Sequence, residues 1–258
     1  MTEPLATFPD LRDAAVFITG GGSGIGAALT EAFLEQGARV AFVGRSDAGA
    51  FVEEMAAKHA QRPLFIPCDI TDVAALHAAM DAAAAAHGPL RVLVNNAAND
   101  TRYAASDVTE AVWDQMQAVN LKAYFFACQR AAAQMQASGL GGSIINFSSI
   151  SYMMGIAGLS TYISANAGIM GLTRSLAREW GPDRIRVNAV APGWVLTERQ
   201  RRLWATPEAL SAHVDKQCLK DVMEPRDIAG TVLFLASNLS RMMTGQSLVI
   251  DAGVVGTG

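Results

Sequence analysis

The chain has 258 residues, of which 51% are hydrophobic and 17% charged, and its formal net charge at pH 7 is −4. This composition predicts a single domain over residues 1–258 with a sizeable core, and it excludes a broad electrostatic attraction to nucleic acid or to an anionic membrane. Three separated cysteines and four scattered histidines form neither a disulfide framework nor a metal-binding pattern. No apolar run could span a bilayer and the N-terminal residues lack a secretion signal, so we expect a cytoplasmic protein without a metal.

The first predicted strand covers residues 14–19, after a surface segment at residues 1–13. A glycine-rich turn follows it and opens a helix that ends at Gly37. A strand, a glycine turn and a helix place a diphosphate at a helix N-terminus, where free N–H groups and the helix dipole favour an anion. Glycine allows the phosphates to approach the backbone closely, whereas a plain tight turn is the alternative. We therefore predict dinucleotide contacts at Gly20, Ser23, Gly24, Ile25 and Gly26.

The second strand, at residues 39–43, ends in a sequence that bears on the choice of cofactor. Gly44-Arg45-Ser46 follows it, and the first carboxylate is that of Asp47. An acidic residue at the strand end favours NAD, whereas an arginine accommodates the 2′-phosphate of NADP. The sequence thus predicts NADP as the preferred cofactor, with Arg45 and Ser46 on its phosphate. The alternative is that Arg45 stacks on adenine and that both cofactors are used.

The next two predicted strands cover residues 64–68 and 90–94, and each is followed by a polar segment. Asp69-Ile70 comes after the third strand, and Asp72 is a plausible cap for a helix through residue 86. Asn95-Asn96-Ala97-Ala98 follows the fourth strand and leads into a loop at residues 99–102. That loop is either a solvated turn or one wall of a pocket for a polyhydroxylated substrate, because its amides, carboxylate and guanidinium pair well with hydroxyls.

A long helix at residues 109–137 is predicted to carry Asn120 among mostly apolar neighbours, although asparagine has a low helix propensity. The strand at residues 143–148 then ends next to Ser149. A helix beginning near Ser160 places Tyr162 and Asn166 on one face, one turn apart. A serine at the strand end can hold an oxygen while the phenol gives or takes its proton, which suits interconversion of an alcohol and a carbonyl.

The sixth strand, at residues 185–190, is followed by a Pro-Gly turn and a polar, irregular segment at residues 198–220. Arg199, Arg201 and Arg202 in that segment form either a solvated helix face or a receptor for an anionic group on a sugar. A last helix at residues 224–236 and a strand at residues 247–250 complete seven β/α repeats. They predict one α/β domain, a doubly wound seven-stranded parallel sheet with helices on both faces, which binds its ligand at the C-terminal strand ends.

Five motifs occur in order along the chain: Thr19-Gly20-x-x-x-Gly24-x-Gly26, Asn95-Asn96-Ala97-Ala98, Asn120, Ser149 with Tyr162, and Pro192-Gly193. Together they resemble the short-chain dehydrogenase/reductase family over residues 14–253. The resemblance implies a single-domain Rossmann-type fold, an oxidoreductase that uses NADP or NAD, and a mobile substrate lid at about residues 197–220. It also implies a homotetramer assembled through the helices at residues 109–137 and 160–180.

The resemblance assigns a role to each matched residue. It implies four catalytic residues, Asn120, Ser149, Tyr162 and Asn166, of which Asn120 holds a water in a proton relay. It puts Asp69 and Ile70 against the adenine and Pro192-Gly193 behind the nicotinamide. Beyond the glycine turn, the expected cofactor contacts are Arg45, Ser46, Asp69, Ile70, Asn96, Ala97, Ala98, Tyr162, Asn166, Pro192, Gly193, Val195 and Thr197.

Three shorter sequences are similar to those of the NAD(P)-dependent sugar dehydrogenases of this family, which oxidise C1 of an aldose to a lactone. They are Asn-Asp-x-Arg after the fourth strand, Ser149-Ile150-Ser151, and Thr-Glu-Arg-Gln at the start of the lid. The similarity implies substrate contacts at Asn99, Arg102, Ser149, Ser151, Tyr162, Trp194 and Arg199. The alternatives are another secondary alcohol or ketone as the substrate, or a catalytically dead NAD(P)-binding sensor.

The chain departs from the family pattern at Ala98, where the family has glycine, and at Asn166, where it has lysine. A lysine ammonium favours the tyrosine phenolate, whereas Asn166 is neutral and could still hydrogen-bond to the cofactor ribose. Three interpretations of Asn166 remain open. It is an introduced substitution of a lysine, or a natural residue in a site where the nicotinamide ring and a nearby arginine supply the field, or the mark of a sensor that has lost catalysis.

Overall fold

The computed structural model describes residues 5–256, so residues 1–4 of the expected N-terminal surface segment lie outside the described part. Seven parallel strands form one sheet in the order β3-β2-β1-β4-β5-β6-β7, which confirms the predicted doubly wound architecture. The strands are β1 Ala15–Thr19, β2 Arg39–Gly44, β3 Leu64–Pro67, β4 Leu90–Asn95, β5 Gly142–Phe147, β6 Ile185–Pro192 and β7 Ser247–Ile250. The order of the strands reverses between β1 and β4, where this fold leaves a crevice at the C-terminal strand ends.

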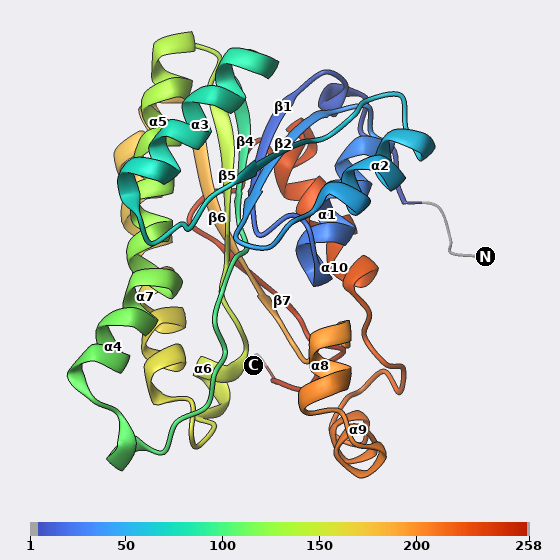
Figure 1. The fold of residues 1–258 in the computed structure, drawn as a ribbon, viewed down its shortest axis with the longest axis vertical. Helices are drawn as coiled ribbons and strands as arrows, with labels where there is room; N and C mark the ends of the chain where they lie inside the picture. The colour runs from blue at the N-terminus through green and yellow to red at the C-terminus, as the bar shows by residue number, and fades with distance from the viewer. Residues whose placement is uncertain (1–4, 257–258) are drawn as a thin grey trace.

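Helices cover both faces of the sheet (Figure 1). One face carries α1 Gly24–Glu35, α2 Gly49–Lys58 and α10 Pro225–Ala236, and the other carries α3 Val73–His87, α5 Ala123–Ser138 and α7 Ser160–Trp180. The shorter helices α4 Glu110–Gln117, α6 Ser151–Met154, α8 Glu198–Leu203 and α9 Pro207–Val214 lie in the lower part of Figure 1. No helix within residues 5–256 is long and apolar enough to cross a membrane.

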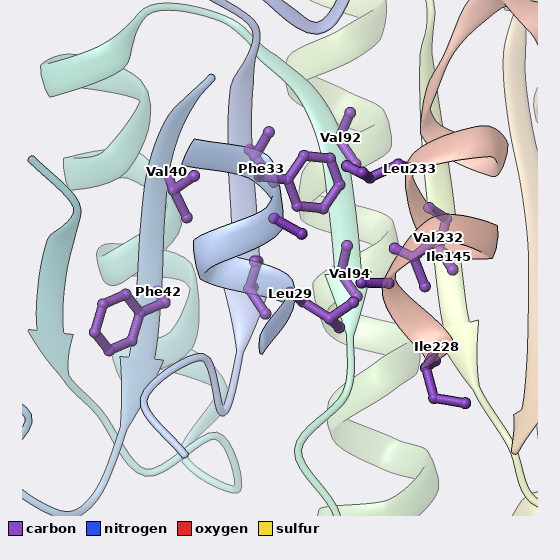
Figure 2. Packing of buried hydrophobic residues seen from close by; sticks show 14 of the residues in the cluster. Leu29, Phe33, Val40, Phe42, Val92, Val94, Ile145, Ile228, Val232 and Leu233 are labelled. Carbon is purple, nitrogen blue, oxygen red and sulfur yellow. The ribbon is translucent and has the colours of Figure 1, made fainter. Parts of the chain in front are cut away.

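Successive side chains of the central strands point to opposite faces of the sheet, so the core is divided into two hydrophobic clusters. In β1, Val16 and Ile18 point to the cluster under α1 and α10, whereas Phe17 points to the cluster under α3 and α5. Figure 2 shows the first cluster, in which Leu29 and Phe33 of α1 pack against Val92 and Val94 of β4. Because both faces are covered, the strands are apolar almost throughout, as expected for a parallel sheet.

The expected long helix at residues 109–137 is interrupted. Thr109 caps α4 by accepting a hydrogen bond from the Val112 N–H at 3.2 Å, but a π-helical turn at Ala118–Lys122 separates α4 from α5. In this turn the Ala123 N–H donates to the Ala118 carbonyl, five residues back. Such bulges insert one residue into the helix and frequently mark functional sites. The turn contains Asn120, the residue whose presence within a helix required an explanation.

Two other expectations about local structure were incomplete, two helices were not predicted, and one predicted cap was confirmed. The segment at residues 198–220 is not irregular throughout, because it forms α8 and α9, each capped by a threonine side chain. Helices α2 and α6 were not predicted. The N-terminal segment is not wholly at the surface, because Leu11 is buried in the core. Asp72 does cap α3 as predicted, accepting a hydrogen bond from the Ala75 N–H at 3.0 Å.

Candidate active site

A cleft of about 880 Å³ opens at the C-terminal ends of the strands. It runs from the glycine turn after β1, past the ends of β2 and β3, to the N-terminal turn of α7. The predicted site residues that line it are Gly20, Ser23, Ile25, Gly26, Arg45, Ser46, Asp69, Ile70, Asn96, Ala97, Ala98, Asn99, Arg102, Ser149, Ser151, Tyr162, Pro192, Gly193, Trp194, Val195, Thr197 and Arg199. Three predicted site residues do not line it: Gly24, Asn120 and Asn166.

The glycine turn is held in a shape that suits a diphosphate. Gly20 has a left-handed φ of 72°, and a Cβ at Gly26 would overlap the carbonyl oxygen of Gly20. Asn96 fixes the turn from the end of β4, because its amide donates to the Thr19 carbonyl at 3.1 Å. The turn therefore fits the phosphates of a dinucleotide at the N-terminus of α1. Asn96 acts here by holding the turn.

Gly24 belongs to the glycine turn and faces Thr197, at the start of the segment that is expected to form the substrate lid. Its φ is 54°, and a Cβ built on it would lie 3.2 Å from the Cγ2 of Thr197. Thr197 also caps α8 through the Gln200 N–H at 3.2 Å. The predicted cofactor contact Thr197 thus touches both the phosphate turn and the first helix of the lid.

The adenosine end of the cleft carries groups of both signs. Arg45 and Ser46 are exposed beside the end of β2. The pKa of Asp69 is lowered chiefly by the hydrogen bond from the Thr71 N–H and in part by the positive charge of Arg45. Asp47 also lines the cleft, but one of its oxygens accepts a hydrogen bond from the Gly49 N–H at the start of α2, at 3.1 Å. The guanidinium of Arg45 therefore remains available to a phosphate.

Ser149 and Tyr162 are brought together as predicted, from the end of β5 and the first turn of α7. The Ser149 hydroxyl accepts a hydrogen bond from the Ser151 N–H at 3.2 Å. Burial raises the pKa of Tyr162, and the negative charge of Asp100 raises it further. Hydrogen bonding from the Asn166 and Ser149 side chains partly offsets this rise in pKa. The pair can orient a hydroxyl and exchange its proton.

Asn166 is buried in α7, one turn after Tyr162. Its side chain is 2% exposed and does not line the cleft. Its amide nitrogen donates to the backbone carbonyl of Tyr162, one turn back in α7, at 2.9 Å. A side chain of this length turns back onto its own helix, so the expected hydrogen bond to the ribose is not supported by the geometry.

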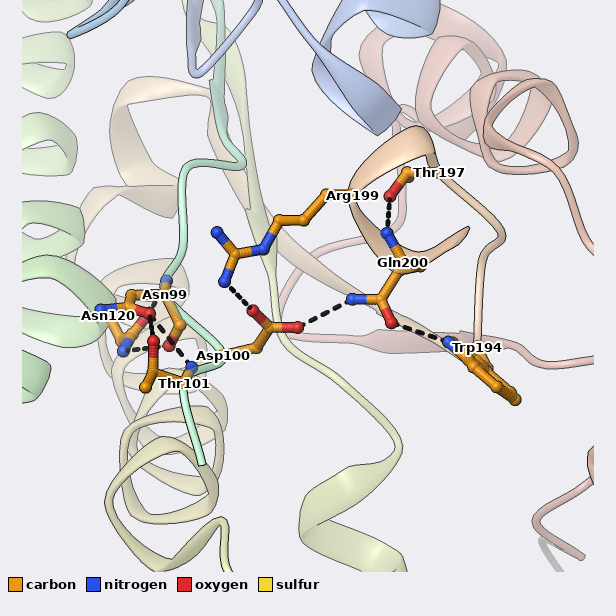
Figure 3. A network of polar contacts seen from close by, with 8 residues as sticks. All are labelled: Asn99, Asp100, Thr101, Asn120, Trp194, Thr197, Arg199 and Gln200. Carbon is orange, nitrogen blue, oxygen red and sulfur yellow. Dashed lines mark hydrogen bonds and ion pairs between the residues drawn. The ribbon is translucent and has the colours of Figure 1, made fainter. Parts of the chain in front are cut away.

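Asn120 does not line the cleft either, but it bonds to Asn99, which does. Its side-chain oxygen accepts from the Asn99 N–H at 2.8 Å, and its amide donates to the Asn99 carbonyl at 3.0 Å. Asn99 in turn accepts from the Thr101 N–H and hydroxyl, at 3.0 and 2.6 Å. The side chain of Asn120 therefore fixes the shape of the loop after β4 (Figure 3).

A polar bridge joins this loop to the lid. Asp100 accepts hydrogen bonds from Arg199 and Gln200, each at 2.8 Å, through its two different oxygens. Gln200 accepts in turn from the Trp194 indole at 2.8 Å (Figure 3). A second contact lies beside it, where the Arg102 guanidinium is 4.4 Å from the centre of the Trp204 ring. We call these two contacts the loop–lid bridge.

The three lid arginines do not form one receptor. Arg199 is paired with Asp100, whereas Arg201 lies 3.4 Å from the carboxylate of Glu224. Arg202 is exposed and does not line the cleft. The idea of a common anion receptor formed by these arginines is therefore not supported by their positions.

Several cleft-lining residues were not among the contacts expected from the sequence, although Asp100 and Gln200 belong to segments that it drew attention to: Asp100, Tyr124, Gln200, Trp204, His213 and Lys216. Two of them carried a usable signal. Asp100 is the only carboxylate in the loop at residues 99–102, and Tyr124 comes one helical turn after Asn120. The others depend on how α8 and α9 fold over the cleft, which local sequence patterns do not indicate.

Comparison with known proteins agrees with this geometry. A family model described as Enoyl-(Acyl carrier protein) reductase matches residues 20–255. The chain is 53% identical over 256 residues to the probable galactose dehydrogenase GalD of Rhizobium meliloti, covering 98% of this chain and 100% of that protein. It is 46% identical over 250 residues to a D-xylose 1-dehydrogenase of Caulobacter vibrioides, covering 96% and 98%.

Solved structures give the same result. A short-chain type dehydrogenase/reductase from Mycobacterium marinum matches with a TM-score of 0.89 at 32% identity, covering 96% of this chain and 98% of that one. In the present chain, the glycine turn and the Ser149–Tyr162 pair line one cleft of this same fold. The chain therefore belongs to the short-chain dehydrogenase/reductase family and is an NAD(P)-dependent oxidoreductase.

Proposed function

We propose that the protein oxidises C1 of an aldose to the corresponding lactone, with NADP as the preferred acceptor and NAD as the alternative. The observation that carries this proposal is the position of the Ser149–Tyr162 pair beside a polar wall formed by Asp100, Arg102 and Arg199. Carboxylate and guanidinium groups suit the hydroxyls of a sugar. The names of the two sugar dehydrogenases at 53% and 46% identity support the same substrate class.

In the proposed reaction, the nicotinamide supplies the hydride acceptor when it is bound. Ser149 holds the C1 hydroxyl through its own hydroxyl group, and the phenolate of Tyr162 takes the proton from that hydroxyl. The C1–H electron pair leaves as hydride while the C1–O bond becomes a carbonyl, which gives the lactone. Trp194 and the loop–lid bridge exclude water from this part of the cleft.

The positions of the arginines favour a neutral aldose over an acidic or sulfonated one. Arg199 is already paired with Asp100, and a substrate anion would compete with that carboxylate. Asp100 itself repels a second negative charge near Tyr162. Arg102 keeps its charge over the Trp204 ring, so an anionic sugar remains the second candidate.

The preference for NADP leads to a first prediction. Arg45→Ala is expected to weaken NADP binding about 10- to 100-fold, because a charge-assisted hydrogen bond to the 2′-phosphate is lost, while NAD binding changes little. Calorimetric titration of both cofactors measures this. Arg62→Ala is the matched control, since Arg62 pairs with Glu53 away from the cleft. Equal losses for NADP and NAD would instead support stacking of Arg45 on adenine.

The experiment that tests the function is NAD(P)H formation over a panel of neutral and acidic aldoses, at pH 7 and pH 10. We expect neutral aldoses to turn over faster. The raised pKa of Tyr162 leaves little phenolate at pH 7, and the phenolate fraction grows about tenfold per pH unit below that pKa. Activity should therefore be higher at pH 10. Cofactor binding without turnover of any aldose would contradict the proposal and favour another alcohol or a sensor.

The same panel with Asn166→Lys distinguishes the three interpretations of Asn166. An ammonium close to Tyr162 is expected to lower the phenol pKa by about 1–3 units and to raise activity at pH 7 more than at pH 10. Activity in the lysine variant alone would mean that Asn166 disables the site. Comparable activity in both proteins would mean that the site works without the ammonium. No activity in either protein, with the cofactor still bound, would favour a sensor or another substrate.

The assembly and the cellular location remain proposals drawn from the family resemblance, namely a cytoplasmic homotetramer assembled through α4, α5 and α7. Two exposed aromatic residues support a subunit interface on these helices, since Trp113 on α4 is 43% exposed and Phe125 on α5 is 38% exposed.

A further inference from the structure

Three buried side-chain polar atoms that line the cleft have no hydrogen-bond partner within residues 5–256. They are the Oγ of Ser151, the indole nitrogen of Trp204 and the Nε2 of His213. Ser151 lies next to the catalytic pair, since its N–H donates to Ser149. Trp204 and His213 belong to the lid segment, at the end of α8 and in α9. Because buried polar groups in proteins nearly always have a partner, these atoms indicate that a polar ligand binds in this part of the cleft.

The contacts of His213 place it beside the polar wall of the cleft. Its ring meets the Trp194 ring edge to face, with the ring centres 5.2 Å apart and the planes at 89°. The Trp194 indole donates to Gln200, and Gln200 donates to Asp100, each at 2.8 Å (Figure 3). Asp100 belongs to the polar wall described above, next to the catalytic pair. His213 is therefore joined through Trp194 to the part of the cleft where the sugar is proposed to bind.

The helix α9 and the turn after it present one face to the cleft. Four residues of this face line it, at helical spacing: Ala209, Ala212, His213 and Lys216. Both alanines are exposed, so this wall leaves room beside His213. Burial lowers the pKa of His213 and the charge of Lys216 lowers it further, whereas the charge of Asp251 raises it. The imidazole is therefore mainly neutral at pH 7, and each of its nitrogens donates or accepts a hydrogen bond according to the tautomer.

We propose that His213 is a specificity-determining residue, whose Nε2 binds a hydroxyl of the aldose other than the one at C1. Ser149 and Tyr162 hold the C1 hydroxyl in the proposed reaction, so a group from the lid meets a hydroxyl elsewhere on the sugar. Because the terminal torsion of a histidine is broad, a rotation of the ring turns Nε2 from the wall into the cleft. The inference rests on the proposed function, since it assigns a further part of the same sugar.

The test is calorimetric titration of neutral aldoses into the protein saturated with NADPH, or with NADH if that binds more tightly, because this complex binds the sugar without oxidising it. The probes are D-galactose, D-glucose, D-xylose and L-arabinose, each with the derivatives that lack one hydroxyl. His213→Phe removes the nitrogen and keeps a ring against Trp194. We expect it to weaken binding of the best-bound aldose about 5- to 10-fold. The derivative without the matching hydroxyl should lose about the same factor in the parent protein and nothing further in His213→Phe.

Two further variants separate a direct contact from a structural role. Ser211→Ala is the control, since Ser211 is an exposed residue of α9 outside the cleft lining, and it should leave every affinity unchanged. His213→Gln should recover most of the affinity, because its amide can take the place of Nε2.

The possible failures are distinguishable. Unchanged affinity in His213→Phe, or equal losses for the aldose and for all of its deoxy derivatives, would overturn the inference while the proposed function stands. If the parent protein binds none of the aldoses, the proposed function and the inference fail together. Should His213→Phe fail to fold, His213→Leu is titrated in its place, with the same outcomes.

Discussion

Tyr162→Phe is expected to lower kcat/KM for the aldose by about 10³-fold, because a general base contributes roughly 10² to 10⁴ in rate and Ser149 cannot replace it. The phenyl ring keeps the packing of α7, so thermal unfolding should change little, whereas cofactor affinity should fall by the loss of one hydrogen bond, because Tyr162 is also an expected cofactor contact. Initial rates of NAD(P)H formation, cofactor titration and thermal unfolding measure these effects. Because the base is absent, the rise in activity between pH 7 and pH 10 should also disappear.

Tyr152→Phe is the control for that prediction. Tyr152 is a half-buried tyrosine on α6 that does not line the cleft. Its variant should retain the activity and the pH dependence of the parent protein. If Tyr162→Phe keeps more than about a tenth of the activity, proton transfer by Tyr162 is not the step proposed here, since that loss is smaller than general base catalysis provides.

Gly26→Ala is expected to reduce cofactor affinity about 10²-fold and the free energy of unfolding by about 2–3 kcal/mol. The added Cβ would overlap the Gly20 carbonyl and would approach the Asn96 amide to 2.7 Å, so the phosphate turn must shift. Calorimetric titration with NADP and chemical denaturation measure the two effects.

Gly171→Ala is also a glycine-to-alanine substitution, but it is expected to raise the free energy of unfolding. Gly171 is exposed in α7, and a Cβ there would have nothing within 4 Å. Because alanine has the higher helix propensity, this variant should gain about 1 kcal/mol of stability with unchanged cofactor affinity. Equal behaviour of the two variants would mean that the close approach of Gly26 to Gly20 is not what restricts this position.

The fold was predictable because each strand carries its own local signal. Apolar runs such as Ala15–Thr19 and Gly142–Phe147 are short, β-branched in part and bounded by glycine or serine, which is typical of strands buried on both faces. The glycine turn was predictable for the same reason, since its strand and its helix are adjacent in the chain. The Ser149–Tyr162 pair followed from the position of Ser149 at a strand end and of Tyr162 in the first turn of the following long helix.

The remaining parts depend on contacts that the local sequence does not encode. The hydrogen bond between Gln200 and Asp100 joins residues 100 positions apart, and no periodicity reveals such a pair. The π-helical turn at Ala118–Lys122 was missed because the low helix propensity of Asn120 does not indicate which irregularity a helix adopts. The bonds between Asn120 and Asn99, which accompany the bulge, join residues 21 positions apart. Asn166 was expected to face the cofactor by analogy with a much longer side chain.

The position of Thr197 has a consequence for how the two ligands enter. Its methyl group lies over Gly24 at the phosphate turn, and the next residue begins α8, which carries Arg199 and Gln200 to Asp100. The cofactor site and the loop–lid bridge are therefore joined through the short segment from Thr197 to Gln200. By thermodynamic linkage, whatever factor a bound dinucleotide adds to sugar affinity, the sugar must add to dinucleotide affinity. Such a connection favours an ordered sequence, in which the dinucleotide enters first and leaves last.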